Sequence, residues 1–298
     1  MTLANDIRPD APEVQANTPR PWIRRWPLRS PTLPPAMHTN VYLLGEGALL
    51  VVDPGSPEPG ENDRFLDAVA ELEREGHRVE AIFLTHHHPD HVSGTGYLQQ
   101  RLGVPIWAHA LTAERVRERG IAVTRTIAEG ESLAFGPGGC TALHTPGHAP
   151  GHLCLLDSGR GELIAGDMVA SLGTILVSTF DEGDMGVYLA SLERLLALAE
   201  ASAGQGGLRL WPAHGVSVAQ GAELLRFYIW HRRMREDKVV AALRQGPDAV
   251  MALVPRAYSD KPDVDPRLAA VSLLAHLHKL KNEGAARVDE EGIWELVG

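Results

Sequence analysis

Short apolar runs separated by polar turns dominate the first part of the chain. Residues 40–45 and 48–55 are two such runs around a glycine-containing turn, and they predict a β-hairpin. Residues 61–76 carry apolar side chains at helical spacing and end in a glycine, which predicts an amphipathic helix. Further runs predict strands over 79–86, 104–110, 131–136, 140–148, 152–157, 162–167 and 208–215, and helices over 111–119 and 186–200.

The pattern changes near residue 218, where helical periodicity replaces the strand-like runs. Helices are predicted over 218–244, 248–257 and 265–283, and two β-like runs follow within 286–297. Three helices followed by a hairpin is the element order of a winged-helix module. The chain therefore divides into an N-terminal extension (1–35), a sheet-rich domain (36–217) and a helical, winged-helix-like domain (218–298).

The N-terminal extension is rich in proline and arginine, which predicts a partly disordered segment with one strand near Trp22–Trp26. It contains no apolar core of the kind found in a secretory signal, and no apolar run in the chain is long enough to span a bilayer. Two cysteines cannot build a disulfide framework, so we expect a cytoplasmic protein. The net charge of −10 argues against a dedicated nucleic-acid-binding protein.

Polar residues that can bind metals follow one predicted strand after another. If the strands share a sheet, these loops gather at one of its edges. The loops are DPG at 53–55, HHHPDH at 86–91, TPGH at 145–148, GD at 166–167 and AHG at 213–215.

The histidine-rich loop has the pattern H-x-H-x-D-H. His86 and His88 are two residues apart, so an extended backbone points both the same way. A proline then turns the chain, and Asp90 and His91 follow as a second pair. Imidazole nitrogen and carboxylate oxygen are ligands for zinc and similar ions, so the motif offers one pair to each of two neighbouring metals. His87 points the other way and is expected to support the ligands or to pack in the core.

Three residues further along can complete such a pair of sites. His148 can complete the first site, His214 can complete the second, and the two oxygens of Asp167 can bridge the ions. This set resembles that of the metallo-β-lactamase superfamily over roughly residues 38–216. The resemblance implies an α/β fold, namely an αββα sandwich, with a dinuclear site at one edge. Zinc is the expected metal, with manganese or iron as alternatives.

The resemblance also assigns supporting roles and narrows the branch of the superfamily. Asp53 corresponds to an aspartate that supports a metal-binding loop by hydrogen bonding, and His152 is a candidate for a similar role. Asp167 stands where the β-lactamase branch has a cysteine. The aspartate resembles the glyoxalase II, lactonase and ribonuclease branches, so antibiotic hydrolysis is not the expected main activity. The short interval between Asp167 and His214 leaves no room for a β-CASP insertion.

The C-terminal part resembles a lactamase-β-2-like subgroup. Its predicted long helix carries an H-R-x-x-R-E stretch formed by His231, Arg232, Arg235 and Glu236, and DMGVYLASLERL at 184–195 agrees with the same subgroup. Known members include an endoribonuclease acting on single-stranded RNA and thioesterase-like hydrolases. Basic and acidic residues are equal in number over 222–298, which is weak support for RNA binding. We expect this part to wall the active-site cleft or to form a homodimer interface.

The sequence thus predicts a metal-dependent hydrolase that uses a hydroxide held by two metal ions. Asp90 and His88 are the predicted catalytic residues, and Asp90 both ligates a metal and orients the nucleophile. No general acid stands out beyond Tyr188 and His231, which favours a thiol leaving group and hence a small-molecule thioester or activated ester. The alternatives are a single-stranded RNA endoribonuclease and a persulfide-dioxygenase-type enzyme with one iron on His86, His148 and Asp167.

Overall fold

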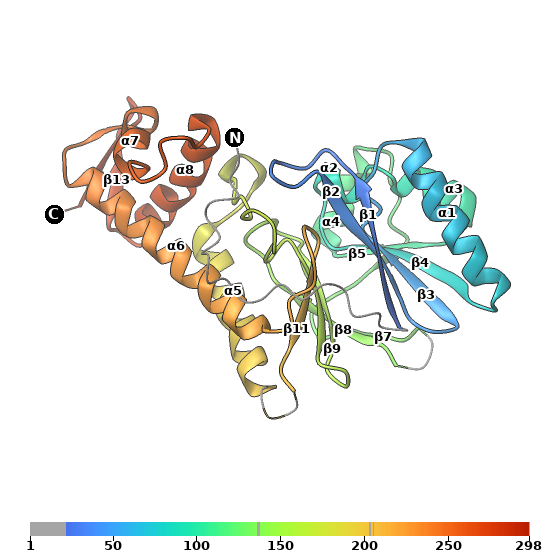
Figure 1. The fold of residues 1–298 in the computed structure, drawn as a ribbon. Coiled ribbons are helices and arrows are strands. Elements are labelled where there is room, and N and C mark those ends of the chain that lie inside the picture. The colour runs from blue at the N-terminus through green and yellow to red at the C-terminus, as the bar shows by residue number, and fades with distance from the viewer. Residues whose placement is uncertain (1–21, 136–137, 203, 205, 298) are drawn as a thin grey trace.

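Two β-sheets lie face to face between layers of helices, and a smaller helical region follows at the C-terminal end of the chain (Figure 1). These features come from a computed structural model that describes residues 22–135, 138–202, 204 and 206–297. Predictions for residues 1–21 and for residue 136 lie outside the described residues. No helix in these ranges is both long and apolar enough to cross a membrane.

The first sheet is mixed. Its first three strands pair antiparallel, and from the third strand onward the neighbouring strands run parallel. In spatial order its strands are β1 (Ile23–Arg29), β2 (His38–Leu44), β3 (Ala48–Val52), β4 (Arg78–Leu84), β5 (Ile106–Ala108) and β6 (Arg125–Thr126). The predicted hairpin is confirmed as β2 and β3. The strand predicted near Trp22–Trp26 is β1, which pairs with β2 along its whole length.

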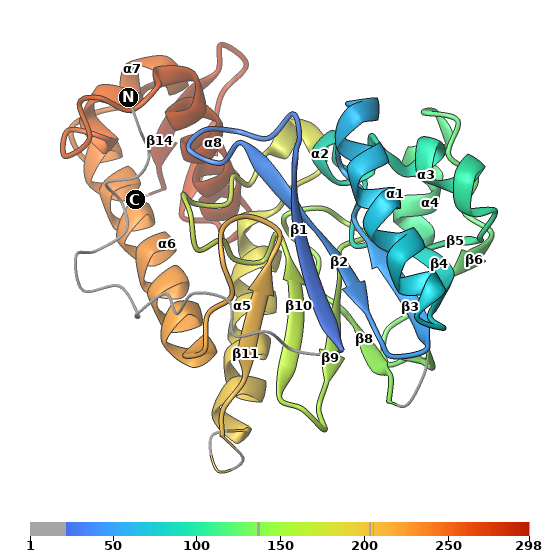
Figure 2. The same ribbon diagram turned by 45° about the vertical axis from the view of Figure 1, so that its right-hand side comes forward.

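The second sheet is antiparallel except where β10 and β11 run parallel. Its spatial order is β11 (Arg209–Pro212), β10 (Glu162–Gly166), β9 (Leu153–Asp157), β8 (Cys140–His144) and β7 (Ser132–Leu133). Helices cover the outer face of each sheet, so the layers follow the predicted αββα order (Figure 2). They are α1 (Pro59–Arg74), α2 (Pro89–Val92), α3 (Thr95–Leu102), α4 (Ala110–Arg117) and α5 (Met185–Ala201), with a 3₁₀ turn η2 (Thr179–Asp181) before α5.

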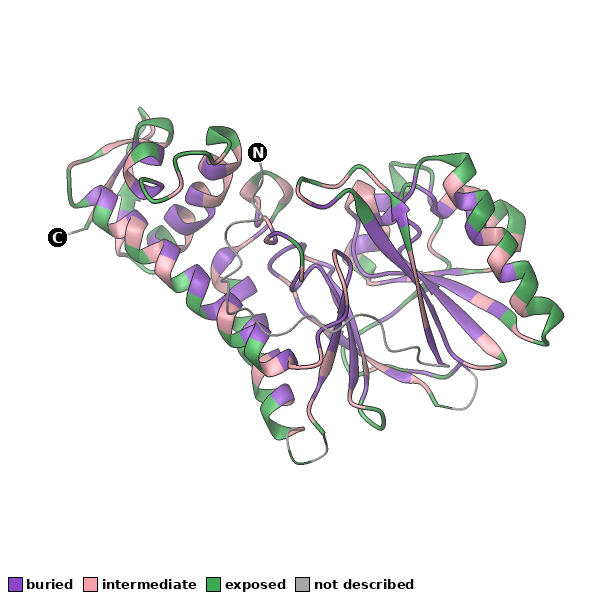
Figure 3. Cartoon of the chain, in the orientation of Figure 1, coloured by how far each residue is buried: buried purple, intermediate pink, exposed green. Residues whose placement is uncertain are grey.

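The alternation of side chains along the strands builds three apolar layers. In β2, Val41 and Leu43 face the outer helices, whereas Tyr42 and Leu44 face the second sheet. Adjacent residues of a strand point to opposite faces, and both faces of this sheet are covered, so nearly every position is buried (Figure 3). The third layer packs the second sheet against α5 and the helix that follows β11.

The C-terminal region contains the three predicted helices and the hairpin after them, and one short strand that was not predicted lies between the first two helices. Its elements are α6 (Gly221–Leu243), β12 (Asp248–Ala249), α7 (Val250–Ala257), α8 (Pro266–Asn282), β13 (Ala286–Val288) and β14 (Ile293–Leu296). The helix α6 packs along α5, and its Leu225 and Tyr228 join the apolar layer beneath the second sheet. The boundaries predicted at residues 36 and 218 stay predictions.

Several predicted elements differ from the structure, and two of these differences lie beside the first sheet. Helix α3 was not predicted, because Gly96 and the polar pair Gln99–Gln100 weaken its apolar period. The strand predicted over 104–110 is only three residues long, because α4 begins at Ala110 directly after the sheet edge. Neither difference moves the loops that carry the candidate ligands.

Candidate metal centre

The candidate ligands come together at the edge where strands of both sheets end. The chain leaves β4 at Leu84 and runs through the histidine loop into α2. The parallel pairing of β3 and β4 sets the end of β3 beside it, where the Asp53 amide donates to the Phe83 carbonyl at 3.0 Å. The second sheet contributes the β8–β9 loop and the ends of β10 and β11. All seven predicted ligands therefore lie at one edge.

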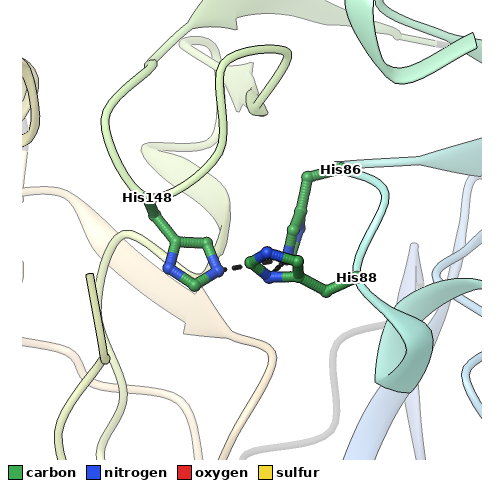
Figure 4. Close-up of side chains that lie close together, drawn as sticks. All are labelled: His86, His88 and His148. Atoms are coloured by element: carbon green, nitrogen blue, oxygen red, sulfur yellow. Dashed lines mark hydrogen bonds between the residues drawn. The ribbon is translucent and has the colours of Figure 1, made fainter. Parts of the chain in front are cut away.

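Three imidazoles form the first half of the centre, which we call the His148 half: His86, His88 and His148 (Figure 4). His86 Nε2 lies 3.0 Å from His88 Nδ1 and 3.2 Å from His148 Nε2. His86 and His88 come from the loop after β4, whereas His148 comes from the β8–β9 loop. The three ring nitrogens converge on one point, as the ligands of a single ion do.

Asp90, His91 and His214 form the other half, which we call the His214 half. Asp90 Oδ2 lies 3.4 Å from His214 Nε2 and 3.8 Å from His91 Nε2. Asp90 and His91 lie on α2, which begins at Pro89, so the proline turns the second pair of the motif as predicted. His214 comes from the loop after β11.

Asp167 lies between the two halves. Its Oδ1 is 3.4 Å from both His91 Nε2 and His214 Nε2, and its Oδ2 is 3.4 Å from His148 Nε2. Each carboxylate oxygen therefore faces a different half, as a bridging ligand requires.

Hydrogen bonds on the far side of the rings fix which nitrogen faces the centre. His148 Nδ1 donates to the Leu176 carbonyl at 2.9 Å, and His214 Nδ1 donates to the His38 carbonyl at 3.1 Å. A carbonyl can only accept, so both rings carry their proton on Nδ1 when neutral and turn the Nε2 lone pair inward.

Asp53 orients two more ligands from beneath. Its Oδ2 accepts from His91 Nδ1 at 2.8 Å and from the Thr85 hydroxyl at 2.7 Å, and its Oδ1 accepts from the Thr85 amide at 2.7 Å. The Thr85 hydroxyl can then accept from His86 Nδ1, which is 2.9 Å away. Asp53 adopts a φ of 52°, an unfavourable conformation for a residue with a side chain. These contacts fit the supporting role that the family resemblance implies for Asp53.

His152 supports Asp167 rather than the open centre. Its Nε2 accepts from the Asp167 amide at 3.0 Å, and its Nδ1 lies 2.8 Å from the Thr145 hydroxyl. The residue before Asp167 must be glycine. A Cβ on Gly166 would lie 2.5 Å from His152 Nε2, and the φ of 48° at this position suits glycine. The AGD sequence therefore lets the Asp167 backbone amide come within hydrogen-bond distance of the His152 imidazole.

Asp181 contributes to the site and was missed in the sequence. From η2 it accepts hydrogen bonds from His88 Nε2 at 2.5 Å and His87 Nε2 at 3.2 Å. His88 consequently turns Nδ1, not Nε2, towards the centre, and His87 is held outside it. Asp181 lies in a loop without hydrophobic periodicity and far from the motif in sequence, so no local pattern marked it.

Neighbouring charges give the two halves opposite protonation. Burial, then the charges of nearby imidazoles, lowers the pKa of His86 well below its ordinary value and that of His148 to about 3. Burial also opposes charge on His214, but the Asp167 and Asp90 carboxylates outweigh it and raise its pKa to about 10. The same carboxylates and Asp53 raise the pKa of His91 well above its usual range despite burial.

The unpartnered atoms at the centre fit a divalent cation. His91 Nε2 and Asp167 Oδ1 are buried, and within the described ranges neither has a hydrogen bond of normal geometry. They face each other at 3.4 Å. Unpartnered buried polar atoms are costly, so a nitrogen and an oxygen left open at the same point favour an ion that both can bind.

The candidate general acids lie outside this arrangement. Tyr188 is fully buried on α5, and its hydroxyl donates to the Met168 carbonyl at 2.7 Å. Burial raises its pKa far above the ordinary value. His231 lies on α6, where its ring stacks on Phe227 at 6.0 Å between centroids. The contacts of both side chains stabilise the packing of their helices and do not direct either residue at the metal centre.

Comparison with known proteins agrees with this architecture. Residues 34–203 match the family model described as the metallo-beta-lactamase superfamily, and residues 249–294 match a beta-lactamase associated winged helix domain. A structure of a beta-lactamase domain protein from Burkholderia ambifaria superposes with a TM-score of 0.81 at 21% identity, covering 97% of this chain and 96% of that one. At that identity the likeness shows the fold.

Curated relatives extend the similarity along most of the chain. A beta-lactamase-like protein 2 homolog from Drosophila melanogaster is 27% identical, with 85% of each chain covered. An atrochrysone carboxyl ACP thioesterase from Aspergillus chevalieri is 30% identical, covering 80% of this chain and 70% of the relative. With its two sheets, its clusters of histidine and aspartate, and its C-terminal winged helix domain, the chain belongs to the metallo-beta-lactamase superfamily.

Proposed function

We propose that the protein is a hydrolase that binds two divalent metal ions and cleaves thioesters. The observation that carries the proposal is the Asp167 carboxylate, which turns one oxygen to each half of the centre. The His148 half would hold one ion and the His214 half the other, with Asp167 shared between them. Zinc is the first choice for imidazole and carboxylate ligands, and manganese or iron also suit this set.

When bound, such ions lower the pKa of water towards neutrality and polarise the electrophile. The side chains position the reactants. Burial opposes the charge on Asp90, but His91 and His214 outweigh it and hold its pKa below the ordinary value, so the carboxylate stays an acceptor. Asp90 can therefore accept a hydrogen bond from the attacking water and orient it. His88, fixed by Asp181, keeps its Nδ1 directed at the reaction centre.

A thioester substrate fits the surroundings of the centre and the relatives. A thiol with a pKa of about 8.5 leaves without a strong general acid. This agrees with Tyr188, the candidate acid, having its hydroxyl bonded to a backbone carbonyl. Two of the relatives, from Claviceps purpurea and Aspergillus chevalieri, are named atrochrysone carboxyl ACP thioesterases. Their names support the thioester class and do not fix the acyl group of this protein's substrate.

The test is a metal-reconstitution assay with a panel of substrates. Chelated protein is dialysed, reloaded with Zn²⁺, Mn²⁺ or Fe²⁺, and assayed on acyl thioesters, lactones, a phosphodiester and single-stranded RNA. We expect thioester turnover that is lost on chelation and returns with two ions per chain. Full turnover by the metal-free protein would refute the proposal. RNA cleavage lost in Asp90→Asn would favour a ribonuclease, and one iron per chain with oxygen uptake would favour a dioxygenase.

A further inference from the structure

The H-R-x-x-R-E stretch of α6 takes no direct part in the chemistry proposed above, yet its arginines are buried. Arg232 is only 3% exposed and points from α6 towards the segment 168–176, which follows Asp167. A buried guanidinium needs acceptors for its N–H donors, so its hydrogen-bond partners identify the part of the chain that it stabilises.

The segment 168–176 contains no helix or strand and is held by side chains of α5 and α6. Tyr188 donates to the Met168 carbonyl at 2.7 Å. The Tyr228 hydroxyl accepts from the Ala170 amide at 2.8 Å and lies 3.0 Å from the Ala170 carbonyl. These two tyrosines fix the first part of the segment.

Arg232 fixes the last part of the segment, next to a ligand. Its guanidinium donates to the Ile175 carbonyl and lies 5.5 Å from the centre of the Tyr188 ring. The next carbonyl in the chain, that of Leu176, accepts from His148 Nδ1 at 2.9 Å. The carbonyl that Arg232 holds and the carbonyl that orients His148 therefore belong to adjacent residues.

The following turn of α6 is bound to the C-terminal region. Arg235 donates to both carboxylate oxygens of Asp260 at 3.0 Å, just after α7. Glu236 accepts from Lys279 Nζ at 2.8 Å and lies 3.4 Å from His276 Nδ1, both on α8. The same stretch of helix thus grips the segment 168–176 on one side and α7 and α8 on the other.

We propose that Arg232 is a positioning residue for the metal centre: it holds the Ile175–Leu176 backbone so that His148 presents Nε2 to a cation. Through Arg235 and Glu236 the C-terminal region supports the same geometry. The inference rests on the proposed function, because it assumes that the His148 half binds an ion. It gives the H-R-x-x-R-E stretch a role in metal binding that requires no contact with the substrate.

The test compares Arg232→Met with Arg233→Met in the full-length protein. Methionine removes the donors of Arg232 while filling much of its space. Arg233 is the matched control, because its side chain is 64% exposed and bound only to Glu193 among the partners observed. Cobalt(II) is titrated into metal-free protein and followed by its absorption spectrum, with His148→Ala and His214→Ala identifying the two binding steps. Hydrogen exchange of residues 168–177 is measured without metal.

We expect Arg232→Met to weaken the step assigned to the His148 half about ten- to hundredfold, the usual effect of losing a group that orients a ligand. The other step should change little, and the segment 168–177 should exchange faster. Arg232→Lys keeps an N–H donor for the Ile175 carbonyl, so it should recover part of the affinity. Arg233→Met should behave as wild type.

Equal cobalt binding by wild type and Arg232→Met would overturn the role of Arg232. Equal weakening of both steps together with a lower unfolding temperature would also overturn it, because this would indicate a general contribution to folding. Wild-type protein that binds no cobalt would refute the proposed function itself, and with it the inference. The two failures are therefore distinguishable.

Discussion

Both halves of the centre contain buried histidines, yet the two halves differ in charge. In the His148 half, His148 has a pKa of about 3 and His86 a pKa well below its ordinary value, so their imidazoles are neutral at pH 7. In the His214 half, carboxylates raise the pKa of His214 to about 10 and that of His91 well above the usual range. Without metal, these two rings carry protons.

The difference shows that burial alone does not decide the state of a histidine. Burial disfavours charge in both halves, and Asp167 faces both. Only in the His214 half do further carboxylates, Asp90 and Asp53, add to Asp167 and reverse the effect of burial. An ion entering the His148 half meets neutral rings at His86 and His148, whose lone pairs are already free. An ion entering the His214 half must first displace protons.

Removing Asp167 should have the largest effect on metal binding and activity, because both halves depend on its carboxylate. Asp167→Asn keeps the size of the side chain but removes the charge that faces His91, His148 and His214. We expect kcat/KM to fall about 10³-fold or more, with metal content below two ions per chain. Metal analysis and thioester assays check this, with exposed Asp237→Asn as the control. Wild-type metal content and rate in Asp167→Asn would contradict the bridging role.

Removing one histidine from each half should separate the two binding steps. His148→Ala should abolish the step that depends less on pH, and His214→Ala should abolish the step that depends more strongly on pH. Each loss should exceed about 100-fold in affinity, because a ligand contributes more than the groups that orient it. Cobalt(II) titrations at pH 6 and 8 would measure both. If both variants lost the same step, the centre would not consist of two halves.

The pH dependence of metal binding should differ between the halves. The rings of His91 and His214 lose protons on binding, so affinity of the second step should rise about tenfold per pH unit for each proton displaced. His148 and His86 should release no proton in the first step over the same range, since the pKa of His148 is about 3 and that of His86 lies well below its ordinary value, so this step should depend less on pH. Calorimetry in buffers of different ionisation enthalpy counts the protons released. Equal proton release in both steps would contradict the assignment.

The same shifts set the stability of the metal-free protein. The raised pKa of His214 stabilises the fold below the unfolded value near ~6.5, and this contribution is lost as the pH rises through about 10. For His148 the sign is opposite: its neutral ring gives a contribution that is present above pH ~6.5 and lost on acidification towards about 3. Denaturant unfolding of metal-free His214→Gln against pH isolates the first effect, and its alkaline loss of stability should be smaller than in wild type.

The smallest effect should come from Asp53→Asn. The asparagine oxygen can still accept a hydrogen bond, but the negative charge next to His91 is lost. The pairing of β3 and β4 should stay intact. We expect the second metal-binding step to weaken about tenfold, with the first step unchanged. Cobalt titration tests this, and an equal change in both steps would show that Asp53 supports the loop as a whole.

The ligands that the first sheet contributes could be predicted from the sequence because they lie close together in one short loop. One strand followed by H-x-H-x-D-H brings four of the candidate ligands together within six residues, whatever the rest of the fold. His148, Asp167 and His214 each follow a different strand, so the residues alone showed only that they can bind metal. Their convergence came from the family resemblance, and the structure shows it as the sheet order β11-β10-β9-β8.

The residues that orient the ligands were harder to predict. Asp53 lies at a predicted strand end, and the family resemblance gave it a supporting role. Asp181 and Arg232 instead contact segments that are distant in the sequence, so no local pattern marks this role. Backbone acceptors such as the carbonyls of Leu176 and His38 carry no sequence signal at all, because every residue has one. Orientation of a ligand is a property of tertiary structure.

The packing of α6 on α5 has a practical consequence for expressing fragments of this protein. The match to the superfamily model ends at residue 203, and a fragment cut there would lack β11 and the candidate ligand His214 as well as α6. Such a truncation would uncover the side chains that Leu225, Tyr228 and Ile229 shield in the full-length chain. It should yield aggregated material in a recombinant host, so the smallest usable clone must extend through α6.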